Sequence, residues 1–203
     1  MRLRSVLGIA LAVGVAVASE AADPYRLDES HSSVEFKIRH LIGNVTGRFG
    51  DFEGTLPFAA ADPTRSSIRI SIRAASIDTA EPKRDEHLRS PDFFDADTYP
   101  EMTFESARIA RRGDDLYQVT GRFSMHGVTK ELTIPVEFLG AARDPWGNER
   151  VGFSSIFPLN RKDWGIVWNK TLDAGGLLLG DEVTATIHLE LVRETPPPAA
   201  ASK

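Results

Sequence analysis

The feature that most constrains this chain is the alternation of apolar and polar residues over short stretches. Residues 34–38, 68–72, 132–138 and 183–191 each place apolar side chains at every second position. Successive side chains of a β-strand point to opposite faces, so this period predicts strands with one apolar and one polar face. A sheet that meets water on one side must close on itself or pack against a second sheet. We therefore expect an all-β fold.

The sequence predicts about eight strands joined mostly by short turns. They are residues 34–38, 45–58, 68–72, 102–110, 116–125, 129–139, 151–159 and 183–191. Gly43-Asn44 is expected to form the first turn, and Gly50 and Gly54 indicate bends within the second strand. Regular hairpins together with glycine bends favour an antiparallel barrel over a sandwich. Outward positions carry charge rather than an apolar band, which argues against a barrel of the outer-membrane type.

One segment, around residues 80–97, is expected to be helical. Thr79 is a candidate N-cap, Pro82 fits the first turn, and Ser90-Pro91 should end the helix and open a second short turn. The segment carries an apolar cluster of Leu88, Phe93 and Phe94. The cluster suits a lid over an open barrel end, or a crossover that packs its rings on a sheet edge.

The two ends of the chain are not expected to belong to the fold. Residues 1–22 combine a basic start, a short apolar run and small residues before a cleavage site, which is the pattern of a signal peptide. Residues 195–203 are rich in proline and alanine and are expected to be disordered or removed. One domain, residues 23–194, remains. The chain has no cysteine and carries a net charge of −5, so we expect an exported protein without disulfides that does not bind nucleic acid.

The inward positions of the predicted barrel are apolar and often aromatic. They are Phe36, Ile38, Phe49, Phe104, Ile134, Phe138, Phe153 and Phe157. Such a lining suits an apolar guest, and it equally suits a densely filled core. His40 keeps the parity of Phe36 and should face the same way.

Motifs for catalysis are scarce. The five histidines show no zinc-binding spacing, and no nucleophile elbow or phosphate-binding glycine loop is present. His40 is read as a satisfied polar group at a strand end. Residues 161–163 are read as a solvated turn, although Arg161 and Asp163 at a barrel mouth could bind a polar head-group.

Four separated motifs resemble one known family. SHSSVEFKIRHLIGNVTGRF at 30–49, RDEHLRSPDFFDADTYPEMTFES at 84–106, GRFSMHGVTKELTIPV at 121–136 and NRKDWGI at 160–166 are similar to segments of the YceI-like family of bacterial periplasmic proteins. The resemblance extends from Tyr25 to Arg193. The family's NRxDFG motif has Trp164 at its aromatic position here, a change expected to narrow that end of the pore.

The resemblance implies an extended, lipocalin-like barrel of eight antiparallel strands with a helical crossover near one end. It also implies a pore that holds a polyisoprenoid or a similar long amphiphilic chain, such as an isoprenoid quinone tail. Members of the family are not established enzymes, so the resemblance implies a binding role and no cofactor other than the bound lipid.

Our expectation from the sequence is a periplasmic carrier for such a lipid. The expected ligand-binding residues are Phe36, Ile38, His40, Phe49, Leu88, Phe93, Phe94, Phe104, Ile134, Phe138, Phe153, Phe157, Arg161, Asp163 and Trp164. Transient contact with the inner membrane or a membrane protein, and a homodimer, are left open. The rivals are an enzyme that acts on the bound lipid with His40 or Asp163 as the acid–base group, and a structural or adhesive domain with a filled barrel.

Overall fold

The computed structural model describes residues 23–173 and 175–194, so the predicted signal peptide at 1–22 and the predicted tail at 195–203 lie outside the described residues. The strands are β1 (Tyr25–Leu27), β2 (Ser33–His40), β3 (Gly43–Phe49), β4 (Phe52–Thr55), β5 (Arg69–Arg73), β6 (Ile77–Asp78), β7 (Glu101–Arg111), β8 (Leu116–Met125), β9 (Val128–Arg143), β10 (Glu149–Asn160) and β11 (Leu179–Arg193). The helix is α1 (Pro82–Arg89), and 3-10 turns occupy Glu29–His31, Pro63–Arg65, Ala74–Ser76 and Arg161–Trp164. Within the described ranges, no helix is both long and apolar enough to cross a bilayer.

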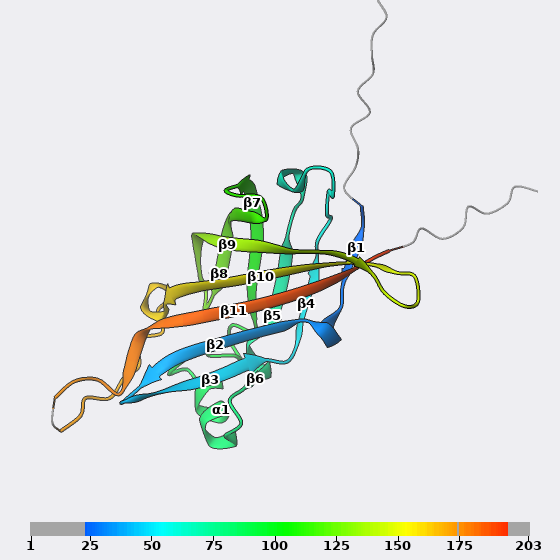
Figure 1. The fold of residues 1–203 in the computed structure, drawn as a ribbon. Coiled ribbons are helices and arrows are strands. Elements are labelled where there is room, and N and C mark those ends of the chain that lie inside the picture. The colour runs from blue at the N-terminus through cyan, green and yellow to red at the C-terminus, as the bar shows by residue number, and fades with distance from the viewer. Residues whose placement is uncertain (1–22, 174, 195–203) are drawn as a thin grey trace, which may run out of the picture.

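The strands form a closed antiparallel barrel (Figure 1). Hydrogen-bonded neighbours follow the order β1-β4-β5-β7-β8-β9-β10-β11, and β1 also pairs with β11, which closes a ring of eight strands. Strands β2, β3 and β6 continue from β11 toward the other end of the molecule. The all-β barrel predicted from the alternating pattern is confirmed. We call the end that contains β1 the closed end.

We call the opposite end the mouth end. Among the described residues, two stretches of strand there lack a paired backbone neighbour on one side, and we call each such stretch a seam. Strand β9 pairs with β10 only through residues 137–143, and residues 43–47 of β3 pair only with β2. The first seam, between β9 and β10, contains two prolines, which have no N–H to donate. Pro135 of β9 lies where the backbone pairing stops, and Pro158 of β10 lies further along the seam. Ser155 Oγ donates a hydrogen bond of 2.5 Å to Pro135 O across this seam. Apolar side chains of both strands, including Ile134 and Phe157, cluster behind it.

The predicted second strand, residues 45–58, is wrong as a single element. It breaks at Gly50-Asp51 into β3, which pairs with β2, and β4, which pairs with β5. The N–H of Gly50 donates to Ser76 O at 3.2 Å and Asp51 O accepts from Arg73 N at 2.9 Å, so the bend is held by other parts of the chain. The predicted turn at Gly43-Asn44 is also wrong, since both residues belong to β3 and the turn is Leu41-Ile42.

Helix α1 is shorter than predicted and has a different cap. It ends at Arg89, and Ser90 caps its C-terminus before a turn at 91–94, as Ser90-Pro91 indicated. Glu81, not Thr79, is the N-cap, and its carboxylate accepts from Lys83 N at 3.3 Å. Thr79 is instead bound to Asp85, whose Oδ1 accepts from the N–H of Thr79 at 2.9 Å and from its hydroxyl at 2.5 Å. This contact fixes the helix to the strand that precedes it.

Replacing Asp85 with alanine should lower the free energy of unfolding by about 1–3 kcal/mol. Asp85 and Thr79 are both buried, so the Thr79 N–H and hydroxyl would be left without their acceptor. Glu86 is the control, since it is the next residue, exposed and on the same helix, and Glu86→Ala should change stability by less than about 0.5 kcal/mol. Urea unfolding of both variants measures the difference, and equal stabilities would show that the Thr79–Asp85 contact contributes little.

A cluster of charges holds the closed end together. Arg150 of β10 donates from Nη1 to Asp28 Oδ2 at 2.7 Å and to Glu190 Oε1 at 2.5 Å, and from Nε to Asp144 Oδ2 at 2.9 Å. Asp28, His31 and Glu190 also have the spacing of a possible metal site, but Arg150 already neutralises two of these groups. The cluster joins β10, β11 and the turn after β1, so it is a structural contact.

Stability should fall as the pH is lowered through the acidic range. Hydrogen bonds from Ser30 and Arg150 hold the pKa of Asp28 well below its usual value. Burial alone would raise the pKa of Asp144, but hydrogen bonds from Asn148 and Arg150 outweigh it and also leave that pKa low. A carboxylate with a lowered pKa in the folded state stabilises the fold above its unfolded pKa of about 3.9 and loses this contribution as the pH falls toward its folded value.

The measurement is the melting temperature of the parent protein and of Arg150→Met between about pH 6 and about pH 2. The variant should start lower and depend less steeply on pH, because each of two carboxylates loses one of the partners that lower its pKa. Parallel curves would show that Arg150 does not set the acid response.

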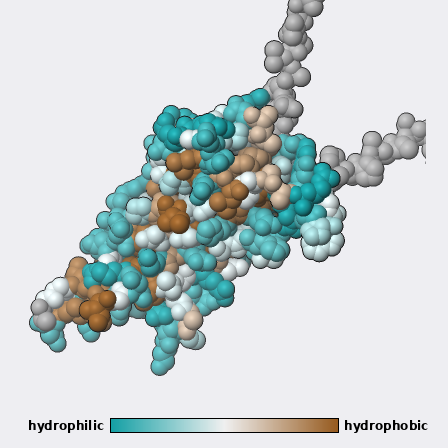
Figure 2. Space-filling view, in the orientation of Figure 1, coloured by the Kyte–Doolittle hydropathy of each residue, from teal (hydrophilic) through white to brown (hydrophobic). Residues whose placement is uncertain are grey.

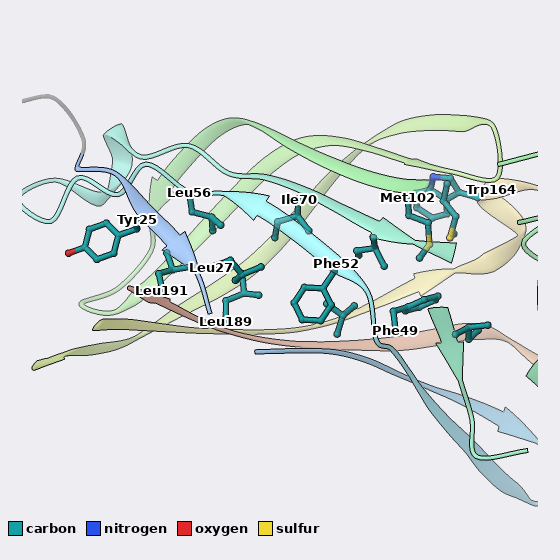
Figure 3. Packing of buried hydrophobic residues seen from close by; sticks show 14 of the residues in the cluster. Tyr25, Leu27, Phe49, Phe52, Leu56, Ile70, Met102, Trp164, Leu189 and Leu191 are labelled. Carbon is teal, nitrogen blue, oxygen red and sulfur yellow. The ribbon is translucent and has the colours of Figure 1, made fainter. Parts of the chain in front are cut away.

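Part of the buried core lies at the closed end beside β1. Figure 3 shows Tyr25, Leu27, Leu189 and Leu191 close together beside β1, while Met102 and Trp164 lie toward the other end. The ring of Phe58 packs against the rings of Tyr25, Phe138 and Phe153, and its centroid lies 5.4–5.7 Å from each of theirs. We call these four rings the aromatic partition.

Candidate functional site

The main feature of the interior is a cavity of about 360 Å³ that is lined almost wholly by apolar atoms. Its wall is formed by side chains of β2, β3, β5, β7, β8, β9, β10 and β11 and of α1. The volume falls in the usual range of ligand pockets, roughly 300–1,000 Å³. The barrel is therefore not filled by its own side chains along its whole length, which argues against the filled-core alternative.

Most of the residues expected to bind a ligand lie in this wall. They are Phe36, Ile38, His40, Phe49, Leu88, Phe93, Phe94, Phe104, Ile134, Phe153, Phe157 and Arg161. They come from seven different elements, and strand parity places the apolar set on the inner face as predicted. Gly47 faces Phe36 across the sheet, and a Cβ at Gly47 would lie 2.5 Å from the ring of Phe36. The absence of a side chain there lets this ring lie against the sheet.

Three of the expected residues lie outside the wall. Phe138 belongs to the aromatic partition and borders a cavity at the closed end instead. Asp163 is exposed and its Oδ1 accepts from Lys130 Nζ at 3.3 Å. Trp164 is buried against Phe123, with ring centroids 5.4 Å apart, and its Nε1 donates to Phe123 O at 3.4 Å. Trp164 thus packs against β8, with Lys130 of β9 over its ring.

Arg161 is not part of a solvated turn, so that prediction is wrong. Its side chain is almost fully buried, and burial lowers the pKa of the guanidinium while Asp181 opposes the shift. Nε donates to Gly180 O at 3.0 Å, and Nη1 donates to Ile166 O and Trp168 O, each at 2.8 Å. Two of these acceptors belong to the loop after Trp164, and the third belongs to the start of β11. Arg161 therefore positions the loop that forms part of the cavity wall.

The mouth end is where the wall changes from paired strands to helix and loop. Leu88 and Phe94 of the α1 segment and Trp168 and Leu178 of the loop line the cavity there and are only partly buried. Phe94 packs edge-to-face on Phe49 with ring centroids 5.7 Å apart. The α1 segment covers the seam beside β3 with its rings turned inward. The placement has features of both alternatives, since the segment borders the mouth of the cavity and Phe94 packs on a ring of β3 near the sheet edge.

Two polar side chains of the wall at this end are His40 and Arg84. His40 lies on the cavity side with Phe36 and Ile38, as its parity predicted, and no hydrogen bond to its ring is found among the described residues. Arg84 lines the cavity but directs Nε and Nη2 to the hydroxyl and carbonyl of Thr79, at 2.7 and 2.8 Å. Neither arrangement couples an acid to a base. The site can enclose an apolar chain and offers a few donors near one end.

The sequence patterns missed several wall residues. Val183, Ala185 and Ile187 share the inward parity of β11, so the alternation could have found them. Trp168 and Leu178 lie in a loop without periodicity, and no local signal places them at the cavity.

A second cavity of about 570 Å³ lies at the closed end. It is bordered by charged side chains such as Arg111, Arg143 and Glu149, and it shares Phe58, Pro63 and Tyr117 with the main cavity. The aromatic partition therefore separates an apolar compartment from a polar one.

Comparison with known proteins gives consistent results. The model of the YceI-like domain matches residues 25–191. A UPF0312 protein of Azotobacter vinelandii is 40% identical over 191 residues, which cover 91% of this chain and 96% of the relative. A UPF0312 protein of Vibrio parahaemolyticus is 39% identical over 162 residues, 78% of this chain and 85% of the relative.

Solved structures share the barrel. Burkholderia cenocepacia BcnA is 26% identical with a TM-score of 0.72, and the match covers 81% of this chain and 98% of BcnA. A domain of Saccharophagus degradans, described as a polyisoprenoid-binding domain implicated in plant cell wall breakdown, is 18% identical with a TM-score of 0.62. That match covers 86% of this chain and 100% of the domain, and at this identity it shows the fold alone.

Proposed function

The chain belongs to the YceI-like family, and from this premise we propose that it is a periplasmic carrier for a polyisoprenoid or another long-chain amphiphile, including an isoprenoid quinone. The observation that carries the proposal is the apolar cavity that extends along the barrel to the mouth end. The polyisoprenoid-binding domain of Saccharophagus degradans, which has the same fold, supports this class of ligand.

The chemistry of the wall favours a tail-binding role. Each methylene group that leaves water is stabilised by about 0.8 kcal/mol, so a long chain can be held without any charged contact. An isoprenoid tail is apolar over its whole length, while its head-group would lie at the mouth end beside His40 and Arg84. Binding rather than catalysis is proposed because, among the described residues, neither His40 nor Asp163 is paired with a second acid or base that faces the cavity. Asp163 is in solvent with Lys130, and His40 is in the cavity wall.

The test is organic extraction of the protein purified from the periplasmic fraction without detergent, followed by mass spectrometry. We expect about one long-chain lipid for each protein molecule. A quinone would be recognised by an ultraviolet absorbance that changes on reduction with borohydride, and an isoprenoid alcohol or phosphate by its mass alone. Delipidated protein should recover the same lipid from an extract. Protein that contains no lipid and takes up none would refute the proposal.

A further inference from the structure

The turn between β2 and β3 has an unusual composition for its geometry. It contains two residues, Leu41 and Ile42, and Leu41 has a positive φ of 51°. Two-residue hairpin turns place their first central residue at positive φ, and asparagine, aspartate and glycine are preferred there. A leucine in this conformation is strained. Both side chains are exposed, and Ile42 is as exposed as in an extended chain, at 106%. Packing within the fold does not account for these residues.

The turn is joined to a second exposed apolar segment. The N–H of Leu41 donates to Leu178 O at 2.9 Å, and the N–H of Leu178 donates to Lys170 O at 2.9 Å. Val167 and Leu177 of this loop are also exposed. We call Leu41, Ile42, Val167 and Leu177 the apolar tip. Figure 2 shows apolar residues gathered at the lower left, where Figure 1 draws this loop and the β2–β3 hairpin.

The apolar tip is continuous with the mouth of the main cavity. His40 precedes Leu41 and lines the cavity, and Leu178 lines the cavity while it bonds to Leu41. Two exposed cations, Arg39 and Lys170, flank the tip, with Asp173 as an opposing carboxylate on the same loop. Arg39 Nη1 donates to Leu41 O at 3.0 Å, which holds this cation beside the turn.

We propose that the apolar tip inserts into the surface of a lipid bilayer and places the mouth of the cavity against the acyl chains. The inference rests on the proposed function. A long apolar chain that passed through water would expose every methylene group, and a mouth in contact with the bilayer avoids this exposure. Apolar side chains that enter the headgroup–acyl boundary, beside cations that meet anionic headgroups, are the usual elements of interfacial binding. Four side chains are too few for a stable protein interface, which buries roughly 1,200–2,000 Å².

The experiment is flotation of the protein with vesicles made of equal parts phosphatidylethanolamine and phosphatidylglycerol. Ile42→Asp and Leu177→Asp should each lower the bound fraction about tenfold, because a charge replaces an inserted apolar group. The matched controls are Leu139→Asp, at an exposed position on β9, and Trp146→Asp, in the β9–β10 turn near the closed end. Both controls should bind within about twofold of the parent. Circular dichroism checks that all variants remain folded.

Several outcomes would overturn the inference. They are failure of the parent protein to float, unchanged binding by Ile42→Asp and Leu177→Asp, or loss of binding only in Trp146→Asp. The inference would also be overturned if the parent protein did not bind vesicles and instead bound a partner protein through the apolar tip.

Loading experiments separate this inference from the proposed function. Delipidated parent and Ile42→Asp proteins are given an isoprenoid alcohol either dispersed from ethanol or embedded in the same vesicles. We expect equal loading from ethanol and loading from vesicles that is about tenfold slower for the variant. Equal rates from vesicles would refute docking and leave lipid binding intact. No loading of either protein from either source would refute the proposed function itself.

Discussion

Replacement of Ala185 with phenylalanine should empty the cavity and leave the barrel folded. Ala185 of β11 lines the cavity and lies between Phe36 of β2 and Phe157 of β10 in the sheet register. A phenyl ring at this position would project into the space between two rings that already line the wall. We expect at least a tenfold loss of co-purifying lipid and a melting temperature close to that of the delipidated parent, because the ring enters space that the fold leaves open.

The control for this variant is the neighbouring residue, Thr186, which has the opposite parity to Ala185 on β11 and does not line the cavity. Thr186→Phe adds the same ring outside the barrel and should retain the lipid. A filled core would respond to Ala185→Phe in the opposite way, since overpacking costs roughly 1–3 kcal/mol. A strongly destabilised Ala185→Phe variant, together with a parent protein free of lipid, would contradict the interpretation of the cavity as a binding site.

Replacement of Arg161 with alanine should lower the free energy of unfolding by about 3 kcal/mol and release the loop at the mouth end. The guanidinium is the donor for the carbonyls of Gly180, Ile166 and Trp168, and these acceptors would lose their partners together. Because Trp168 lines the cavity, lipid retention should fall as well. Urea unfolding measures the loss of stability, and limited proteolysis within residues 165–178 measures the release of the loop.

Lys162 provides a matched cation for comparison. It is the next residue and exposed, and its Nζ donates to Asp181 at 2.8 Å. An exposed ion pair is worth less than about 1 kcal/mol, so Lys162→Ala should be nearly neutral and should leave the loop resistant to protease. If the two variants behave alike, the loop does not depend on the buried guanidinium.

The barrel could be predicted because strand parity is a local property of the sequence. Alternation at 34–38 and 183–191 is sufficient to place Phe36, His40 and Ala185 on the inner face. The errors arise where distant parts of the chain decide the local structure. The break at Gly50-Asp51 depends on bonds to Ser76 and Arg73, so the glycines alone do not locate it. Strands β1 and β6 contain three and two residues, too few to show a period.

The site was less predictable for the same reason. Threonine is a common N-cap residue, which makes Thr79 the expected cap of the helix, but its hydroxyl and N–H bind the buried carboxylate of Asp85 instead. Arg161 stands in a run of charged residues typical of a solvated turn, and only the folded loop shows that its donors are used on backbone carbonyls. Phe138 has the correct parity, but it lies on the closed-end side of the aromatic partition, and parity alone does not show where along the barrel the cavity ends.

The seam between β9 and β10 affects how firmly the circumference of the barrel is fixed at the mouth end. Strands joined by a full ladder of hydrogen bonds are fixed about 4.8 Å apart, so a completely paired barrel has a fixed cross-section. Beyond Pro135 these two strands are held by side chains and by the hydroxyl of Ser155 rather than by paired backbone groups. Widening of the circumference at the mouth end would therefore cost the hydrogen bond from Ser155 to Pro135 and side-chain contacts, but no hydrogen bond between two backbone groups. Branched and unbranched chains of different thickness would then fit the same protein, and discrimination among lipids would rest on their length and head-group.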